Sequence, residues 1–331
     1  MGDLIHTLPA LTDAARQYPE LAFDWVAEQS FAEIPSWHPA VEKVIPIQLR
    51  RWKHSPLAKK TLQEAGTALR RLRATSFEQI IDAQGLIKSA VLTCLARGQS
   101  GGMDWRSCKE GLAGLSYRTR IAIPIDWHAI DRLRELFAKI LGYHYDINQI
   151  DYGLKRRDFI QDEQQKPFLV FLHGTSAKKK LWSETEWLKL TQLAANQGYE
   201  VLLPWGNESE RTRAERLAFA CPAIRVLSPM NLSQIAGLIA EASGVVGVDT
   251  GLAHLAAALG TPAVTLYIAS SPQLTGARGQ NQICVTTVRS NRLVASKPSS
   301  GQTNIRIYPE LNAASVWEAL EGQIGQAGQA A

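Results

Sequence analysis

The stretch Val245-Val-Gly-Val-Asp-Thr-Gly-Leu-Ala-His-Leu-Ala-Ala-Ala-Leu-Gly260 decides the fold of this chain. Its apolar start predicts a buried strand, its Asp-Thr-Gly predicts a tight turn, and residues 252–259 predict a helix that Gly260 and Pro262 stop. Thr250 is a natural N-cap, and the N–H groups of the first helical turn form a site for an anion. A plain corner between strand and helix is the alternative for this turn alone, but the remainder of the chain favours a phosphate site.

Length and composition bound the class of protein. A chain of 331 residues suits two α/β domains, and a hydrophobic content of 45% is enough for two cores. The net charge of +5 fits anionic substrates or a membrane surface and is too small to indicate nucleic acid. The four cysteines are too scattered for a zinc site or a disulfide framework and fit a reducing cytoplasm. Since no apolar run has the length of a membrane span and no signal-peptide pattern opens the chain, the sequence predicts a cytoplasmic protein.

Expected strands and helices alternate along the chain, which predicts βαβ units and mostly parallel sheets. In the first half, strands are expected at 21–27, 44–49 and 79–83, helices at 62–72, 87–96 and 128–141, and irregular structure at 99–128. In the second half, strands are expected at 167–172, 199–203, 223–227, 245–248, 263–267 and 283–287, and Ser183 opens a capping box. The predicted domains are 1–150 and 151–312, with 142–165 as the linker region. A C-terminal helix and tail follow over 313–331, and packing of this helix on the first domain is left open.

Three strand ends in the second half carry small polar residues, at 173–176, 205–210 and 249–254. Ligands of parallel sheets bind beyond the carboxyl ends of the strands, so these clusters should converge. Hydroxyl and N–H groups suit phosphates and a carboxylate suits ribose hydroxyls, which together predict a site for a nucleoside diphosphate. Lys180, at the end of a lysine run, can neutralise such a leaving group, although a solvated charge run is the alternative. Neither a GxGxxG nor a GxxxxGK[ST] motif occurs, which argues against dinucleotide dehydrogenases and P-loop enzymes.

Segments spread over nearly the whole chain resemble the lipopolysaccharide heptosyltransferases of glycosyltransferase family 9. The Asp249-Thr-Gly-Leu-x-His254 motif marks the wider family, whereas Ile34-Pro-Ser-Trp-His38 and Arg50-Arg-Trp52 favour the first heptosyltransferase over the second. The other matching segments are Met1-Gly-Asp3, His6-Thr-Leu-Pro-Ala10, Phe23-Asp-Trp25, Asp82-Ala-Gln-Gly-Leu86, Lys180-Leu-Trp182 and Leu203-Pro-Trp-Gly206.

The resemblance implies a GT-B fold, in which two Rossmann-like domains bind the acceptor (N-terminal) and the nucleotide sugar (C-terminal). It implies inverting transfer of L-glycero-D-manno-heptose from ADP-heptose to the Kdo of Kdo2-lipid A. Family members begin with an additional apolar strand before the segment that matches Met1-Gly-Asp3. The sequence therefore predicts an N-terminal domain that lacks its first strand and has an unfilled slot in its sheet.

The resemblance also implies roles for single residues. Asp3 matches the family's general base, although an Asp before a helix can merely cap it. Lys180 matches the lysine at the donor's phosphates. The expected donor-binding residues are Thr175, Ser176, Glu210, Asp249, Thr250, Gly251, Leu252 and His254, with helix packing as an equal alternative for His254. The expected acceptor-binding residues are Arg50, Arg51, Lys53, Lys88 and Arg120, because cations suit Kdo carboxylates and lipid A phosphates.

No metal and no cofactor beyond the substrates is implied, and a monomer is expected. The basic N-terminal face favours peripheral docking on the inner face of the cytoplasmic membrane. The alternatives are another family 9 enzyme such as the second heptosyltransferase, a non-catalytic binder of nucleotide sugar or lipid A, and an epimerase on the same scaffold.

Overall fold

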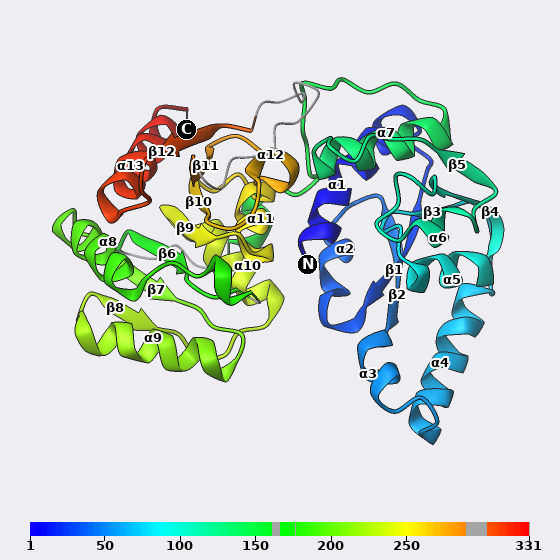
Figure 1. The fold of residues 1–331 in the computed structure, drawn as a ribbon, viewed down its shortest axis with the longest axis horizontal. Helices are drawn as coiled ribbons and strands as arrows, with labels where there is room; N and C mark the ends of the chain where they lie inside the picture. Colours follow the sequence, from blue (N-terminus) through cyan, green and yellow to red (C-terminus); the bar gives the residue numbers. More distant parts are fainter. Residues whose placement is uncertain (161–165, 176, 289–302, 331) are drawn as a thin grey trace. The chain divides into compact units, whose positions relative to one another are not determined.

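The computed structural model describes residues 1–160, 166–175, 177–288 and 303–330 (Figure 1). The chain forms two compact units, and each is described here by itself. The C-terminal unit consists of Met1–Ile5, Asn148–Ile150 and Leu154–Ala331, and the N-terminal unit consists of His6–Ile147 and Asp151–Gly153. The predicted position Ser176 lies outside the described residues.

The C-terminal unit is built on a parallel sheet of seven strands in the order β12-β11-β10-β9-β6-β7-β8. Strands β6, β9 and β10 are buried along their whole length, as expected for apolar runs in a parallel sheet covered on both faces. The strands are β6 (Phe168–Leu172), β7 (Glu200–Leu203), β8 (Ile224–Val226), β9 (Gly244–Val248), β10 (Ala263–Tyr267), β11 (Gln282–Thr287) and β12 (Ile305–Tyr308).

Two of the predicted capping residues, Ser183 and Gly260, lie at helix ends of this unit. The side chain of Ser183 accepts a hydrogen bond from the Glu186 amide, and Asn231 and Gln234 form a full capping box. The left-handed Gly260, at φ 70°, follows α11. The elements are η2 (Arg156–Phe159), η3 (Lys178–Lys180), α8 (Glu184–Asn196), α9 (Glu208–Ala220), α10 (Leu232–Glu241), α11 (Gly251–Ala258), α12 (Pro272–Thr275) and α13 (Ala313–Ala330). Helix α13 packs on α8, β9, β10 and β11 of its own unit.

The strands of the N-terminal unit form two separate parallel sheets. One pairs β1 (Phe23–Glu28) with β2 (Val41–Ile47), and the other has the order β3 (Ser76–Asp82), β4 (Arg97–Met103) and β5 (Thr119–Ile121). Phe23 of β1 and Ile81 of β3 pack on the same apolar core. Within the described residues no ladder joins β1 to β3.

The prediction that residues 99–128 are irregular is wrong, because they contain most of β4 and all of β5. The glycines of this segment are packing positions in a strand. A Cβ on Gly102 would lie 2.4 Å from Cε2 of the Tyr117 ring, and a Cβ on Gly101 would lie 2.7 Å from Cδ1 of Ile140. These glycines are therefore positions where other side chains pack directly on the strand backbone. Composition alone predicts a loop at such glycines.

The helices of the N-terminal unit are α2 (Glu33–Ser36), α3 (Leu49–His54), α4 (Lys59–Leu72), α5 (Ile87–Leu95), α6 (Gly111–Gly114) and α7 (Ala129–Leu141), together with η1 (Gln29–Phe31) and most of α1 (Gly2–Gln17). None of the described helices is both long and apolar enough to cross a lipid bilayer.

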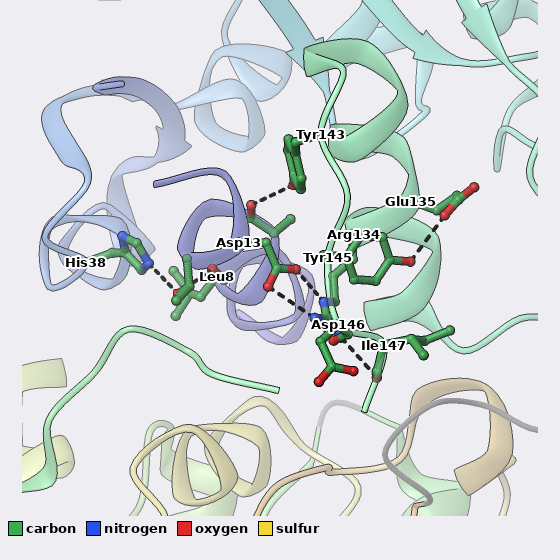
Figure 2. Close-up of polar contacts among 11 residues, drawn as sticks. Leu8, Asp13, His38, Arg134, Glu135, Tyr143, Tyr145, Asp146 and Ile147 are labelled. Atoms are coloured by element: carbon green, nitrogen blue, oxygen red, sulfur yellow. Dashed lines mark hydrogen bonds and ion pairs between the residues drawn. The ribbon is translucent and has the colours of Figure 1, made fainter. Parts of the chain in front are cut away.

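A buried ion pair joins α1 to α7 in the N-terminal unit (Figure 2). The guanidinium of Arg134 is fully buried and donates to both carboxylate oxygens of Asp13, at 2.5 and 3.1 Å. It also donates to the carbonyl of Asp146 at 2.8 Å, and it lies 4.4 Å from the centre of the Tyr145 ring. The single cation thus fixes the first helix and the segment that follows α7.

Candidate active site

The carboxylate of Asp249 lies at the carboxyl end of β9, directly before α11, and side chains from three other segments hold it. Lys180 Nζ lies 2.6 Å from Oδ2, and Ser270 Oγ donates to the same oxygen at 2.5 Å. His254 Nε2 lies 3.7 Å from Oδ1. Burial alone raises the pKa of Asp249, but the contacts with His254, Lys180 and Ser270 outweigh it and hold that pKa well below its usual range. Asp249 is therefore a buried anion at physiological pH.

The turn after Asp249 presents backbone N–H groups. Thr250 occupies the N-cap position of α11, as predicted, but its hydroxyl makes no capping hydrogen bond to any described residue. The carbonyl of Thr250 accepts hydrogen bonds from the amides of Ala253 and His254. Among the described residues, the amides of Gly251 and Leu252 at the start of the helix therefore have no backbone acceptor. Such amides at the positive end of a helix suit a phosphate oxygen.

The first residues of the chain belong to the same unit and lie against this turn. A Cβ on Gly251 would lie 2.7 Å from Cβ of Met1, and a Cβ on Gly2 would lie 3.3 Å from Cδ2 of His254. Asp3 is the next residue, exposed in the first turn of α1. The predicted general base therefore comes from the helix that begins beside the Asp249 turn.

Glu210 connects the ends of β6 and β7. Its Oε2 accepts a hydrogen bond of 2.8 Å from the amide of Gly206, after β7. A Cβ on Gly174, after β6, would lie 2.5 Å from Cδ of Glu210, so this carboxylate lies directly on the Gly174 backbone. Thr175 follows Gly174 and is half-buried. The predicted convergence of strand ends is thus visible in two pairs of contacts, Gly174 with Glu210 and Lys180 with Asp249, while the roles toward a ligand stay predictions.

Sequence reasoning missed Ser270 as a site residue and named His173 only as part of the 173–176 cluster. Ser270 follows β10, the neighbour of β9, and its position at the carboxyl end of that strand was the signal for it. His173 directly follows β6 with its ring fully buried; burial and, to a smaller extent, the positive charge of Arg213 lower its pKa to about 4. This imidazole is therefore neutral at physiological pH, two residues before Thr175.

The predicted acceptor residues lie on three elements of the N-terminal unit. Arg50, Arg51 and Lys53 share α3, where Arg51 forms an ion pair with Glu64 of α4. Lys88 is exposed in the first turn of α5. Arg120 of β5 donates to the carbonyls of Tyr117 at 2.9 Å and Leu115 at 2.8 Å, so its guanidinium partly serves its own loop.

A metal site was not predicted. Across the described ranges, no three His, Cys, Asp or Glu side chains are grouped so that they could hold a metal ion. Lys180 and the N-terminus of α11 place positive charge beside Asp249.

Comparison with known proteins agrees with this architecture. The profile of glycosyltransferase family 9 (heptosyltransferase) matches residues 66–302. Lipopolysaccharide heptosyltransferase 1 of Salmonella typhimurium is 44% identical over 294 residues, which are 88% of this chain and 92% of the relative. The protein of the same name from Pseudomonas aeruginosa is 44% identical over 86% of this chain and 80% of its own.

Among solved structures, the E. coli heptosyltransferase WaaC with ADP superposes with a TM-score of 0.86 at 41% identity, covering 98% of this chain and 97% of that one. The predicted α/β fold of GT-B type and the predicted glycosyltransferase class are confirmed by these matches. This chain belongs to glycosyltransferase family 9, the heptosyltransferases.

Proposed function

We propose that this chain transfers L-glycero-D-manno-heptose from ADP-heptose to the Kdo of Kdo2-lipid A, with inversion at the anomeric carbon. The observation that carries the proposal is the anionic Asp249, held by Lys180, Ser270 and His254 beside the N-terminus of α11. This arrangement offers an acceptor for sugar hydroxyls and positive groups for a diphosphate within a few ångströms of each other. The 44% identity to a heptosyltransferase 1 supports the first heptosyltransferase over the second.

On the donor side, Glu210 would accept hydrogen bonds from the ribose hydroxyls, and Thr175 would contact the phosphates, as Ser176 would in the family pattern. The amides of Gly251 and Leu252 and the ammonium of Lys180 would stabilise the negative charge that grows on the departing ADP. These groups supply the charge without a metal or another cofactor. Asp249 would bind heptose hydroxyls and, as an anion, favour the positive charge that develops on the sugar ring.

On the acceptor side, Asp3 would take the proton from the attacking Kdo hydroxyl. The bond from the Kdo oxygen to the anomeric carbon then forms from the face opposite to the bond that breaks to ADP, which inverts the configuration. Arg50, Arg51 and Lys53 would bind Kdo carboxylates and lipid A phosphates, with Lys88 and Arg120 on the same unit. Since this acceptor is a membrane lipid, we place the enzyme as a monomer in the cytoplasm, peripheral on the inner face of the cytoplasmic membrane.

An ADP-release assay with purified protein, ADP-heptose and Kdo2-lipid A tests the proposal. Turnover is expected with this acceptor and not with an acceptor that already carries the first heptose; the reverse preference would indicate the second heptosyltransferase. ADP binding without turnover would indicate a non-catalytic binder, and conversion of the free nucleotide sugar without acceptor would indicate an epimerase. Asp3→Asn should lower kcat by about 10²–10⁴-fold with ADP affinity little changed, whereas a wild-type kcat would reject Asp3 as the base.

A further inference from the structure

The positive charge of this chain is concentrated in the helical hairpin formed by α3 and α4. Residues 49–73 contain eight of the 36 Lys and Arg and only one of the 31 Asp and Glu, a net charge of +7 when the whole chain carries +5. The remainder of the chain is therefore slightly negative. A general basic character does not explain such a distribution.

The single acidic residue of the hairpin, Glu64, joins its two helices. Glu64 on α4 forms an ion pair with Arg51 on α3, and its Oε2 accepts a hydrogen bond of 3.1 Å from Trp52 Nε1. The other seven cations make no ion pair with any residue that the structure describes; they are Arg50, Lys53, Lys59, Lys60, Arg70, Arg71 and Arg73. All seven are exposed. The hairpin thus has fixed geometry and uncompensated charge.

Helix α4 separates this charge from its packing face. Lys59 and Arg70 are eleven residues apart, as are Lys60 and Arg71, and eleven residues span about three turns, so all four lie on one side of the helix. The two buried residues of α4, Thr61 and Leu72, have the same spacing and lie on the opposite side, where the helix packs against β2. The helix therefore presents cations to solvent in its first and last turns, on the side opposite to its packing face.

The tip of the hairpin is apolar. Leu57, in the connection between the helices, is 86% exposed, and Leu62, in the second turn of α4, is 57% exposed. In Figure 1 the connection lies at the end of the hairpin away from strands β1 and β2 of the same unit. A basic face that ends in exposed leucines is the pattern of a segment that lies in the interface of an anionic membrane.

We propose that the α3–α4 hairpin is the membrane-docking element of this protein, with the Lys59, Lys60, Arg70 and Arg71 face on anionic phospholipid headgroups and Leu57 inserted at the acyl boundary. The inference rests on the proposed function only for the choice of a lipid surface. Charge complementarity supplies the attraction, at about fivefold in partitioning for each cation near an anionic surface. Nucleic acid fits less well, because the remainder of the chain is negative and exposed leucines gain nothing from a phosphate backbone.

Sedimentation with vesicles of phosphatidylglycerol and phosphatidylethanolamine in equal amounts tests this docking without acceptor or donor. The wild-type protein should bind these vesicles, should not bind phosphatidylcholine vesicles, and should be released by salt. Lys59→Gln/Lys60→Gln keeps helix propensity and should reduce partitioning about 25-fold. Leu57→Ser, at a fully accessible position, should reduce it about tenfold.

The matched control is Lys139→Gln/Arg157→Gln, which changes the net charge equally at exposed positions outside the hairpin and should bind vesicles like wild type. Equal binding by Lys59→Gln/Lys60→Gln and wild type, or tighter binding of a DNA duplex than of vesicles at the same salt, would overturn the docking. Heptose transfer to a deacylated, water-soluble acceptor is measured in parallel and should be unchanged in Lys59→Gln/Lys60→Gln. Vesicle binding without transfer would refute the proposed function and leave the docking intact; transfer without vesicle binding would do the opposite.

Discussion

Replacing Gly174 with alanine should damage nucleotide binding much more than folding. The new Cβ would lie 2.5 Å from Cδ and 2.6 Å from Oε1 of Glu210, distances that no carbon atom tolerates. The nearest atoms all belong to one long side chain, which can swing away without moving the backbone. The overlap is therefore relieved by displacing Glu210, which then loses its hydrogen bond of 2.8 Å from the Gly206 amide.

The size of the effect follows from what Glu210 is proposed to bind. Hydrogen bonds to an ionised carboxylate contribute about 1.5–3 kcal/mol, so loss of one such bond to the ribose corresponds to an ADP affinity about 10- to 150-fold lower. Gly174 does not have a positive φ that alanine would strain, so the melting temperature should change little. Isothermal titration with ADP and a thermal melt on the same samples measure both quantities.

Gly206→Ala is the matched control, because its Cβ would lie 3.4 Å from Oε2 of Glu210, an ordinary contact. This variant should bind ADP nearly as wild type does. The reasoning fails if Gly174→Ala binds ADP with unchanged affinity, since the carboxylate would then be irrelevant to the nucleotide. It also fails if both variants lose affinity equally, since the loss would then come from the glycines themselves.

Three other changes test single contacts. Ser270→Ala removes a hydrogen-bond donor from the Asp249 carboxylate, so KM for ADP-heptose should rise about two- to tenfold with a smaller change in kcat. Ser270→Thr keeps the hydroxyl and should restore the wild-type KM. If steady-state kinetics show no change in KM for Ser270→Ala, Ser270 does not position Asp249. Arg134→Met leaves the Asp13 carboxylate buried without a counter-charge and should lower the free energy of unfolding in urea by about 3–5 kcal/mol. If the free energy of unfolding falls no more than in a surface variant, Asp13 is not held as an anion. Because the pKa of His173 falls from 6.5 to about 4 on folding, the unfolded chain binds a proton that the folded one excludes. The stability from this group is complete above pH 6.5 and is lost as the pH falls toward 4, by about 3 kcal/mol in total. In His173→Gln, the free energy of unfolding in urea should therefore fall less between pH 6.5 and 4 than in the wild type. The same pH dependence in both proteins would contradict a buried neutral imidazole.

Much of the C-terminal unit could be predicted because its sequence signals are local. Apolar runs mark β6 and β9, and the caps at Ser183 and Asn231 act within a few residues of themselves. The β4 region could not be predicted in the same way, because Gly101 and Gly102 are explained only by Ile140 and Tyr117, which come from elsewhere in the chain. Glycine at a close approach and glycine in a loop look the same in a sequence.

The site shows the same division. Asp249 directly follows β9, and Lys180 and Glu210 follow β6 and β7 within eight residues, on the side of a parallel sheet where ligand groups gather. Their positions, together with the family resemblance, indicated them as candidates. Ser270 required knowing that β10 lies next to β9, and His173 required knowing that the end of β6 is fully buried. Strand order and burial are properties of the folded unit, and residue type and position in the sequence do not determine them.

The pairing of Lys180 with Asp249 gives the site a specific electrostatic character. A buried carboxylate beside a diphosphate would repel it, and a lone lysine there would be mobile and hydrated. Because Nζ lies 2.6 Å from Oδ2, each charge compensates the other before any ligand arrives. Ser270 and His254 also contact the carboxylate, so Asp249 stays ionised when the lysine turns part of its hydrogen-bonding capacity toward a phosphate. The ammonium has three donors, and among the described residues one of them contacts Asp249. In the proposed reaction the other donors would stabilise the charge that appears on the leaving oxygen, and Asp249 would stabilise the positive charge of the sugar ring.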